Sequence, residues 1–304
     1  MSHEVNPREF SPGKGRGDPR LSGRQAGLAE TGRSDRLQRA DTRRAGEGSR
    51  SAIGKERQRL DLSYKCASKS RSRYNIRVSN RAYLKVWCRD VTPEILPRLL
   101  RAFLETVPFS RTRPGFTQLV LRAVETAESP LVERDLRAAP HAPADVMEAL
   151  GTSLESDSSV ELEAWWDLWH FDLASGQWAE EPHRLELLCH APQFEDGIWR
   201  DSGHFCADLG FEHLFTGHAG LLGNGGAAPG APQDPAEARF LMRMSQPEAL
   251  REYAARTREN IHRLQGWVQR IAETMPLVPQ GGIALGSEGE EDFEARLDAI
   301  EAAG

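Results

Sequence analysis

Residues 160–171 read Val-Glu-Leu-Glu-Ala-Trp-Trp-Asp-Leu-Trp-His-Phe and predict a long β-strand. Side chains of contrasting character alternate along it, which is typical of a strand with two different faces. The turn sequence Ala174-Ser175-Gly176-Gln177 follows, and residues 184–191 predict the partner strand. We therefore expect a β-hairpin here, with a stronger sequence signal than any other hairpin in the chain.

The two faces of this strand predict different surroundings. One face is apolar and is expected to form a helix-covered core: Val160, Leu162, Ala164, Trp166 and Leu168. The other face alternates carboxylates with aromatic rings: Glu161, Glu163, Trp165, Asp167, Trp169 and Phe171. Two interpretations of this second face stay open. Its indoles can stack on a flat ligand while its acids accept hydrogen bonds or serve in acid/base chemistry, or another element or a second subunit covers it. Trp165, Asp167, Trp169 and Phe171 are thus candidate ligand-binding or interface residues.

The flanking sequence predicts further strands and helices. Residues 82–88 alternate as a half-buried strand, and Thr92-Pro93-Glu94 begins a helix that ends near Pro108. Residues 116–124 form a second strand that closes a β-α-β unit, residues 144–154 a second helix, and residues 203–215 a strand with phenylalanines at period two. The predicted class is α+β, with about five mostly antiparallel strands, two helices packed on one face and a long C-terminal amphipathic helix.

That C-terminal helix spans residues 247–275, in which apolar residues alternate spacings of four and three. This a/d seam can pack on the sheet or pair with a second copy of the chain. The predicted organisation is a sheet domain at 78–216, a Gly/Pro-rich connection at 217–234, a helical segment at 235–278 and an acidic tail at 279–304. We expect residues 286–304 to be frayed, with at most a short helix around residues 293–300.

Charge divides the chain near residue 76. Residues 1–75 contain 18 Lys and Arg against 9 Asp and Glu, a net charge of +9, whereas the remainder has 21 against 36, a net charge of −15. We expect a basic disordered leader at residues 1–77. Three interpretations stay open: an arm that binds nucleic acid through phosphates, an ordinary tail, or sequence upstream of a true start at Val78. Nucleic acid is not an expected partner of the acidic body.

Several other residues are candidates for chemistry. His213 and His218 flank the end of the last predicted strand, a position that suits a ligand pocket. The spacing of His204, Asp208 and Glu212 resembles a metal site, but positions four apart on a strand lie roughly 13 Å apart, too far for one ion. The cysteines Cys66, Cys88, Cys189 and Cys206 form no metal-binding pair and predict reduced thiols. We expect no metal and no cofactor, and no motif identifies a catalytic residue.

These observations lead to an expected function class. The mean hydropathy is −0.56 and no long apolar run is present, so no membrane partner is expected. We expect a cytoplasmic, non-enzymatic binding or assembly module that forms a homodimer through its Trp-bearing sheet face or its heptad helix. The alternative is a small-molecule-binding protein or enzyme, with a pocket at Trp165, Asp167 and Trp169 or near His213 and His218.

Overall fold

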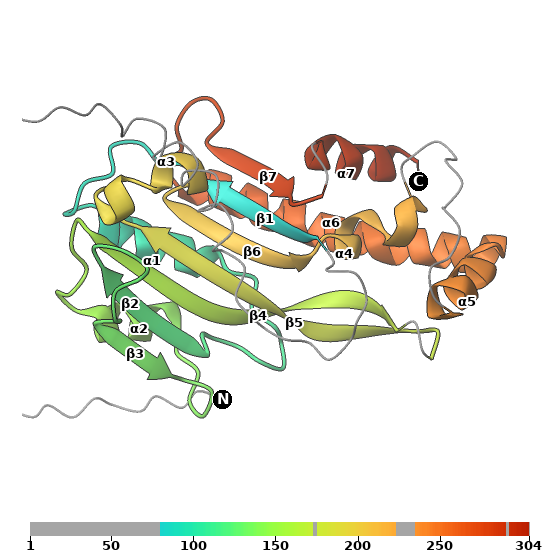
Figure 1. Ribbon diagram of the computed structural model, residues 1–304, viewed down its shortest axis with the longest axis horizontal. Coiled ribbons are helices and arrows are strands. Elements are labelled where there is room, and N and C mark those ends of the chain that lie inside the picture. Colours follow the sequence, from blue (N-terminus) through green and yellow to red (C-terminus); the bar gives the residue numbers. More distant parts are fainter. Residues whose placement is uncertain (1–79, 173–174, 223–234, 290–291, 304) are drawn as a thin grey trace, which may run out of the picture. The chain divides into compact units, whose positions relative to one another are not determined.

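The computed structural model describes residues 80–172, 175–222, 235–289 and 292–303, which belong to one compact unit, Ser63–Gly304 (Figure 1). The predicted leader at 1–77, the candidate start at Val78, Cys66 and most of the connection at 217–234 lie outside the described residues. None of the described helices has the length and apolar character needed to span a membrane.

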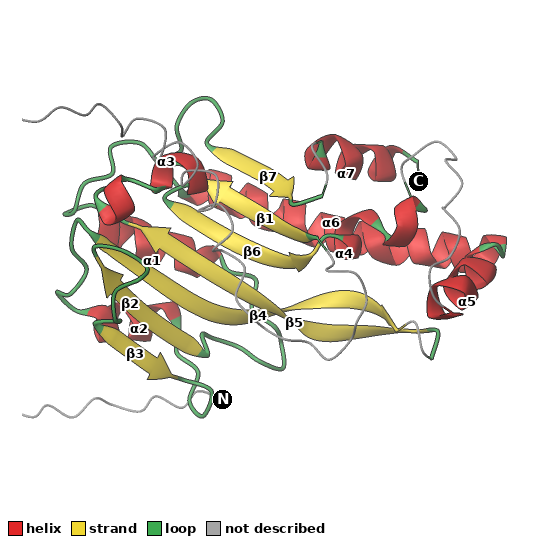
Figure 2. Ribbon diagram, in the orientation of Figure 1, coloured by secondary structure: helices red, strands yellow, loops and turns green. Residues whose placement is uncertain are grey.

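One antiparallel sheet organises the described residues (Figure 2). Its strand order is β3-β2-β4-β5-β6-β1-β7. The strands are β1 Arg81–Val86, β2 Gln118–Ala123, β3 Val132–Asp135, β4 Ser158–Asp172, β5 Gln177–His190, β6 Phe205–Phe211 and β7 Ile283–Ser287. The mixed class, the antiparallel pairing and the central hairpin are confirmed. The strands number seven rather than about five, because the short charged β3 and the glycine-containing β7 carry weak sequence signals.

Helices cover one face of this sheet, and α1, α2 and α6 lie behind it in Figure 1. The core between these layers includes Phe103 of α1 stacked on Phe205, and Trp267 of α6 packed edge-on against Trp166. The helices are α1 Leu96–Thr106, α2 Pro143–Leu150, α3 Trp199–Ser202, α4 His213–Thr216, α5 Pro235–Met244, α6 Pro247–Thr274 and α7 Phe293–Ala302, with 3-10 turns at Phe194–Asp196 and His218–Gly220. As predicted, Val160, Leu162, Ala164, Trp166 and Leu168 of β4 all face this core.

The long hairpin β4–β5 extends beyond its neighbours. β4 pairs with β2 only up to Glu163, so its edge from Ala164 onward has no strand beside it. Helix α6 and the loop after α1 cover this edge instead. Ser110 N–H donates to the Trp165 carbonyl at 2.6 Å, and the Asn260 side chain donates to the Trp169 carbonyl and accepts from the Trp169 N–H. A free strand edge is a template for wrong pairing, and these contacts block it.

The heptad seam of α6 is used within the chain. Thr257, Ile261, Leu264, Ile271 and Met275 are all buried in the core. The first predicted use of the seam, packing on the sheet, is therefore observed, and its other members, Leu250, Ala254 and Val268, are partly buried against the same core. Because α6 shares one core with the sheet, the predicted segments at 78–216 and 235–278 pack on each other.

The predicted boundaries need three corrections. The first helix begins at Leu96 rather than at Pro93, because Thr92 accepts hydrogen bonds from the N–H groups of Ile95 and Leu96 in a preceding turn. The strand predicted at 203–215 ends at Phe211, where its pairing with β1 stops at Arg81, and the chain enters α4 at His213. The expected fraying of residues 286–304 is not observed in the described residues: β7 ends at Ser287 and pairs with β1, and α7, the short helix expected there, buries Phe293, Leu297 and Ile300.

The predicted β-α-β unit is present in an extended form. Successive antiparallel pairings make β1 and β2 parallel to each other, with β4, β5 and β6 lying between them. Helix α1 crosses behind those three strands. The face opposite the helices therefore presents side chains from widely separated parts of the sequence side by side.

Candidate functional site

A row of carboxylates crosses the face of the sheet that α1, α2 and α6 do not cover. We call this surface the polar face. The strand register places Asp135 opposite Gln118, Gln118 opposite Glu163, Glu163 opposite Glu186, and Glu186 opposite Asp208. Like charges directly opposite each other on neighbouring strands destabilise a sheet. This carboxylate row, Asp135, Glu163, Glu186 and Asp208, is thus a feature that folding alone does not favour.

Arginines from the same face pair with this row. Arg184 forms ion pairs with Glu163 at 2.6 Å and with Glu186 at 2.9 Å, so its guanidinium bridges the two opposed acids. Arg81 pairs with Asp208, and Arg137 pairs with Asp135. The hydrogen bonds from Arg137 lower the pKa of Asp135 to about 2. The polar face therefore binds guanidinium groups repeatedly, using side chains of its own chain.

The row runs into a groove of about 770 Å³ at the β3 side of the sheet. We call it the Trp165 groove; it is lined by Thr117, Gln118, Glu133, Asp135, Arg137, Glu163, Trp165 and Arg184. Over β2, β3 and the first half of β4, no described helix lies on this face (Figure 1). Trp165, the first of the predicted site residues, is partly exposed here.

Hydrogen bonds fix the floor of the Trp165 groove. The Trp165 indole Nε1–H donates to Thr117 Oγ1 at 3.2 Å, and the Thr117 hydroxyl donates to Glu163 Oε1 at 2.7 Å. The second oxygen of Glu163 is the one that pairs with Arg184. On the ring itself lies the Arg113 guanidinium, whose Cζ is 4.4 Å from the centroid, within cation–π range. Indole and carboxylate are thus held in place beside each other.

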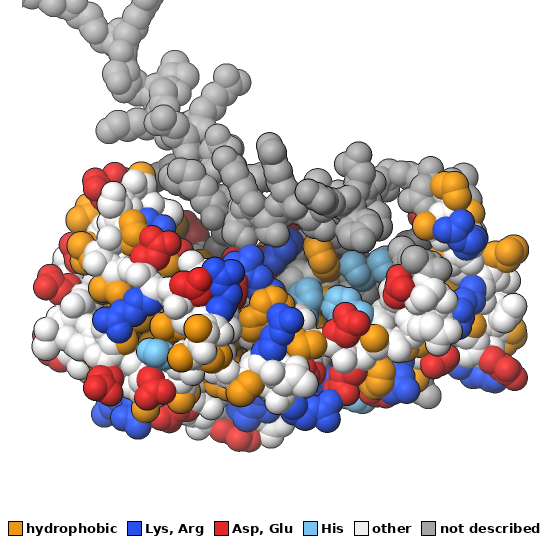
Figure 3. All heavy atoms as spheres, turned by 90° about the horizontal axis from the view of Figure 1, so that it is seen from below, with side chains coloured by type: hydrophobic (Ala, Val, Ile, Leu, Met, Phe, Trp, Pro, Cys, Tyr) orange, Lys and Arg blue, Asp and Glu red, His pale blue; other side chains and the backbone are white. Residues whose placement is uncertain are grey.

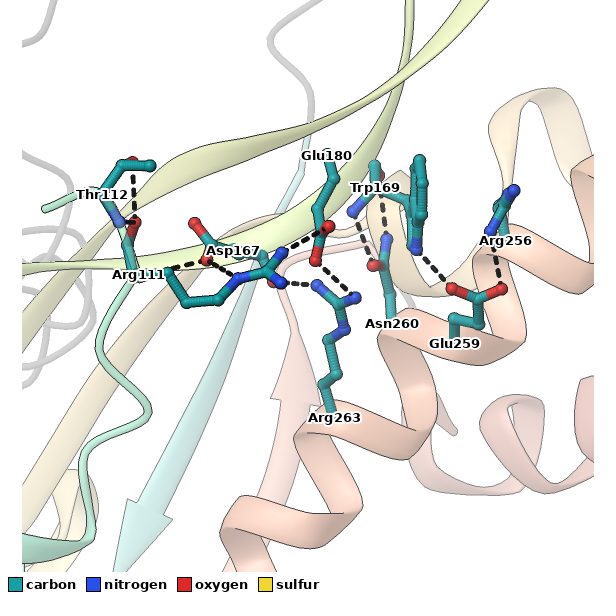
Figure 4. Close-up of polar contacts among 10 residues, drawn as sticks. Arg111, Thr112, Asp167, Trp169, Glu180, Arg256, Glu259, Asn260 and Arg263 are labelled. Carbon is teal, nitrogen blue, oxygen red and sulfur yellow. Dashed lines mark hydrogen bonds and ion pairs between the residues drawn. The ribbon is translucent and has the colours of Figure 1, made fainter.

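Asp167 and Trp169 have structural roles instead (Figure 4). Burial opposes ionisation of Asp167, but hydrogen bonds from Ser110 and Arg111 outweigh it and keep its pKa below the ordinary value. Arg111 also pairs with Glu180 at 2.6 Å. The Trp169 indole donates to Glu259 of α6, and Arg256 lies over its ring at 3.9 Å. These two side chains attach α6 and the loop after α1 to the hairpin, which corresponds to the alternative that another element of the chain covers this part of the face.

Phe171, His213 and His218 belong to an aromatic cluster between the hairpin tip and the C-terminal helices. Phe171 packs against Trp178, Phe240 and Tyr253 at 5.2 to 5.9 Å between ring centroids. His213 and His218 stack on each other at 3.9 Å, and the His218 N–H donates to the Tyr253 hydroxyl. Histidine side chains also gather visibly beside charged ones in the space-filling view (Figure 3). The two histidines contact each other, and the aromatic rings of Phe211 and Phe240 pack against them.

Burial disfavours charge on these histidines. It lowers the pKa of His218 to about 4 and keeps that of His213 well below the ordinary value. Nearby, His170 Nε2 and His183 Nδ1 lie 3.3 Å apart, and burial lowers the pKa of His183 to about 3. Neutral rings at pH 7 suit a packed cluster better than a proton-transfer site.

The described residues are not arranged for metal binding or for thiol chemistry. No group of three His, Cys, Asp or Glu side chains there is arranged to hold a metal ion. His204 accepts a hydrogen bond from the Cys88 N–H at 3.2 Å, and Asp208 pairs with Arg81. Cys88 and Cys189 are free and buried, and Cys206 is also buried. Burial raises the pKa of Cys88 to about 12, so this thiol stays protonated.

The sequence prediction missed most of the groove lining, namely Thr117, Gln118, Glu133, Asp135, Arg137 and Arg184, and it missed Arg113 on the Trp165 ring. The missing information was the strand pairing, including the register of the hairpin. Asp172 pairs with Gln177, so the observed turn is centred one residue before the predicted one. That shift moves every cross-strand partner by two residues, and it places Glu186 rather than Leu188 opposite Glu163. Comparison with known proteins adds no further candidate, since no family model, no curated protein and no solved structure matches the chain.

Proposed function

We propose that this chain is a cytoplasmic binding or assembly module whose polar face docks a partner at the Trp165 groove. The observation that carries the proposal is the carboxylate row, in which Glu163 lies opposite Glu186 and Glu186 opposite Asp208. Residues kept in a locally unfavourable arrangement often serve function rather than stability. The buried free cysteines are in keeping with a reducing compartment.

The partner in this proposal is a macromolecule, and a second copy of the chain is one candidate. Two surfaces are predicted to form dimer contacts, the heptad seam of α6 and the Trp-bearing sheet face. Most of the seam is buried in the core, so the polar face is the more accessible of the two. Its partly exposed indole, fixed by Thr117, resembles the rigid aromatic anchors of protein interfaces.

The second candidate function is the binding of a small polar ligand in the same groove, in place of a macromolecule. A volume of about 770 Å³ falls within the range of small-molecule sites. The His213/His218 region is the weaker location for such a ligand, because stacked rings occupy it.

Light scattering on the full chain over a range of concentrations tests docking of a second copy. We expect the mass of the wild type to rise with concentration and that of Trp165→Asp to stay monomeric. Met242→Asp is the matched control, since Met242 is 70% exposed on α5, away from the polar face. A wild type that stays monomeric, with the Trp165 indole accessible to a quencher, assigns the face to a different partner. A Trp165 indole shielded from quencher in the monomer contradicts the proposal itself, because the face is then already covered.

A further inference from the structure

We propose, building on the proposed function, that the Trp165 groove and the carboxylate row bind an arginine-bearing segment of a partner polypeptide. The groove already shows how a guanidinium binds. Arg113 places its guanidinium on the Trp165 ring at 4.4 Å, the indole of that ring is linked to the Glu163 carboxylate through Thr117, and in the described part of the chain Arg113 forms no ion pair. It therefore occupies the indole face without a carboxylate of its own.

The Arg113 side chain is also placed so that it can move off the Trp165 ring. Its side chain is exposed, whereas the backbone of its loop is anchored: Ser110 N–H donates to the Trp165 carbonyl, and the Arg113 N–H donates to the Ser110 hydroxyl at 3.2 Å. The side chain can swing into solvent while the loop stays on β4. An incoming guanidinium then takes over the ring face and gains the neighbouring acids.

The rest of the row supplies those acids. Arg184 pairs with Glu163 and Glu186, and Arg81 pairs with Asp208. The side chains of these three acids are 13%, 20% and 11% exposed, so part of each is open to an incoming guanidinium. Arginine fits such sites better than lysine because its planar group both stacks on a ring and pairs with carboxylates. At the outer end, the Asp135 and Arg137 side chains are 60% and 74% exposed, so solvent competes with this pair.

The length of the row indicates a polypeptide rather than a small molecule. From β3 to β6 it crosses four strand spacings, or roughly 19 Å at about 4.8 Å each. One arginine side chain covers only part of that distance, while an extended segment with arginines on alternate residues covers all of it. The net charge of −15 on residues 76–304 steers such a cationic segment toward the domain.

The test is a titration of the full chain against a fluorescein-labelled peptide of alternating glycine and arginine, read by fluorescence anisotropy. The matched peptide carries lysine at every arginine position. We expect the arginine peptide to bind more tightly than the lysine peptide and than free L-arginine. Arg113→Ala should tighten binding of the arginine peptide about two- to fivefold. The peptide then no longer has to displace Arg113 from the Trp165 ring, which in the free protein is one exposed cation–π contact.

Arg101→Ala is the control for that variant, because Arg101 is an exposed arginine of α1, which packs on the other face of the sheet. It should leave the affinity unchanged. In wild type labelled with fluorotryptophan, the Trp165 resonance, assigned with Trp165→Phe, should shift on peptide addition. Equal binding of the lysine peptide, binding of free L-arginine as tight as that of the peptide, or an Arg113→Ala affinity at or below wild type overturns the inference.

The two proposals fail in different ways. If the wild type self-associates, Trp165→Asp abolishes self-association and the arginine peptide does not bind, the docking face is correct and its assigned ligand is wrong. If the Trp165 indole is shielded in the monomer, both proposals are wrong.

Discussion

Acidification should destabilise the folded state well above the pH at which carboxylates titrate. Two buried histidines allow the loss in the free energy of unfolding to be calculated. His190 and His204 are 6% and 3% exposed. His204 Nδ1 accepts the Cys88 N–H and its ring stacks on Trp199 at 4.2 Å, an arrangement that requires a neutral imidazole. His190 Nδ1 lies 3.1 Å from the Ser159 hydroxyl. Burial lowers the pKa of each histidine to about 4.

The sign of the effect follows from these values. Each pKa is lower in the folded state than the roughly 6.5 of an unfolded histidine, so the folded state binds fewer protons. The free energy of unfolding is therefore highest above pH 6.5, and it falls as the pH drops from 6.5 toward 4. Between pH 7 and pH 5 each histidine lowers the free energy of unfolding by about 2 kcal/mol, and the pair lowers it by about 4 kcal/mol. That is a large part of the roughly 5 to 15 kcal/mol that stabilises a typical domain.

Urea unfolding at several pH values between 5 and 8, followed by circular dichroism, measures this loss. His204→Asn keeps a side-chain acceptor for the Cys88 N–H and removes the titrating ring. It should lower stability at pH 8 and reduce the loss between pH 7 and pH 5 by about 2 kcal/mol. His141→Asn is the control, because His141 lies outside the core, next to α2. A pH dependence in His204→Asn that equals the wild-type dependence would refute the reasoning.

Three further predictions concern the contacts that hold the fold and the polar face. Asn260→Ala removes the hydrogen bonds of a buried amide to Trp169 and to the Leu214 carbonyl, and should cost about 2 to 4 kcal/mol in urea unfolding, whereas Gln269→Ala at an exposed position of α6 should cost under about 0.5 kcal/mol. Gly210→Ala should lower the melting temperature strongly, because Gly210 has φ +90° and an added carbon would collide with His183 Nε2. A melting temperature equal to that of the wild type would show that Gly210 and His183 are not packed in this way. Arg184→Ala leaves Glu163 opposite Glu186 without the bridging guanidinium and should destabilise by about 1 kcal/mol, and Glu186→Gln in the same chain should recover part of that loss.

Local patterns in the sequence predicted the elements with strong periodicity. The alternation along residues 160–171 identified both faces of β4, and the 28-residue helix α6 was predicted within one residue of its observed end. β3 was missed because it is short and charged, and β7 was missed because it contains a glycine and pairs only with the distant strand β1. The period-two spacing of Phe215 predicts a strand position, but β6 ends at Phe211 and Phe215 lies in α4.

The candidate site depended on long-range information that local patterns lack. Trp165 was identified from its strand, but its partners Thr117 and Arg184 required the pairing of three strands. Trp169 lies on the same strand face as Trp165 by alternation, and yet it attaches α6, because that helix passes along the open edge of β4 at Asn260. The sequence pattern alone does not distinguish these two indoles.

The accessibility of the Trp165 indole is the most direct test of the docking face. Fluorotryptophan-labelled full chain, kept monomeric by dilution and titrated with a soluble paramagnetic gadolinium chelate, reports the exposure of each tryptophan, with Trp165 assigned from Trp165→Phe. We predict strong broadening of the Trp165 resonance and little broadening for Trp166 and Trp267, which are 1% and 0% exposed in the core. A Trp165 resonance as protected as that of Trp267 would contradict an open polar face.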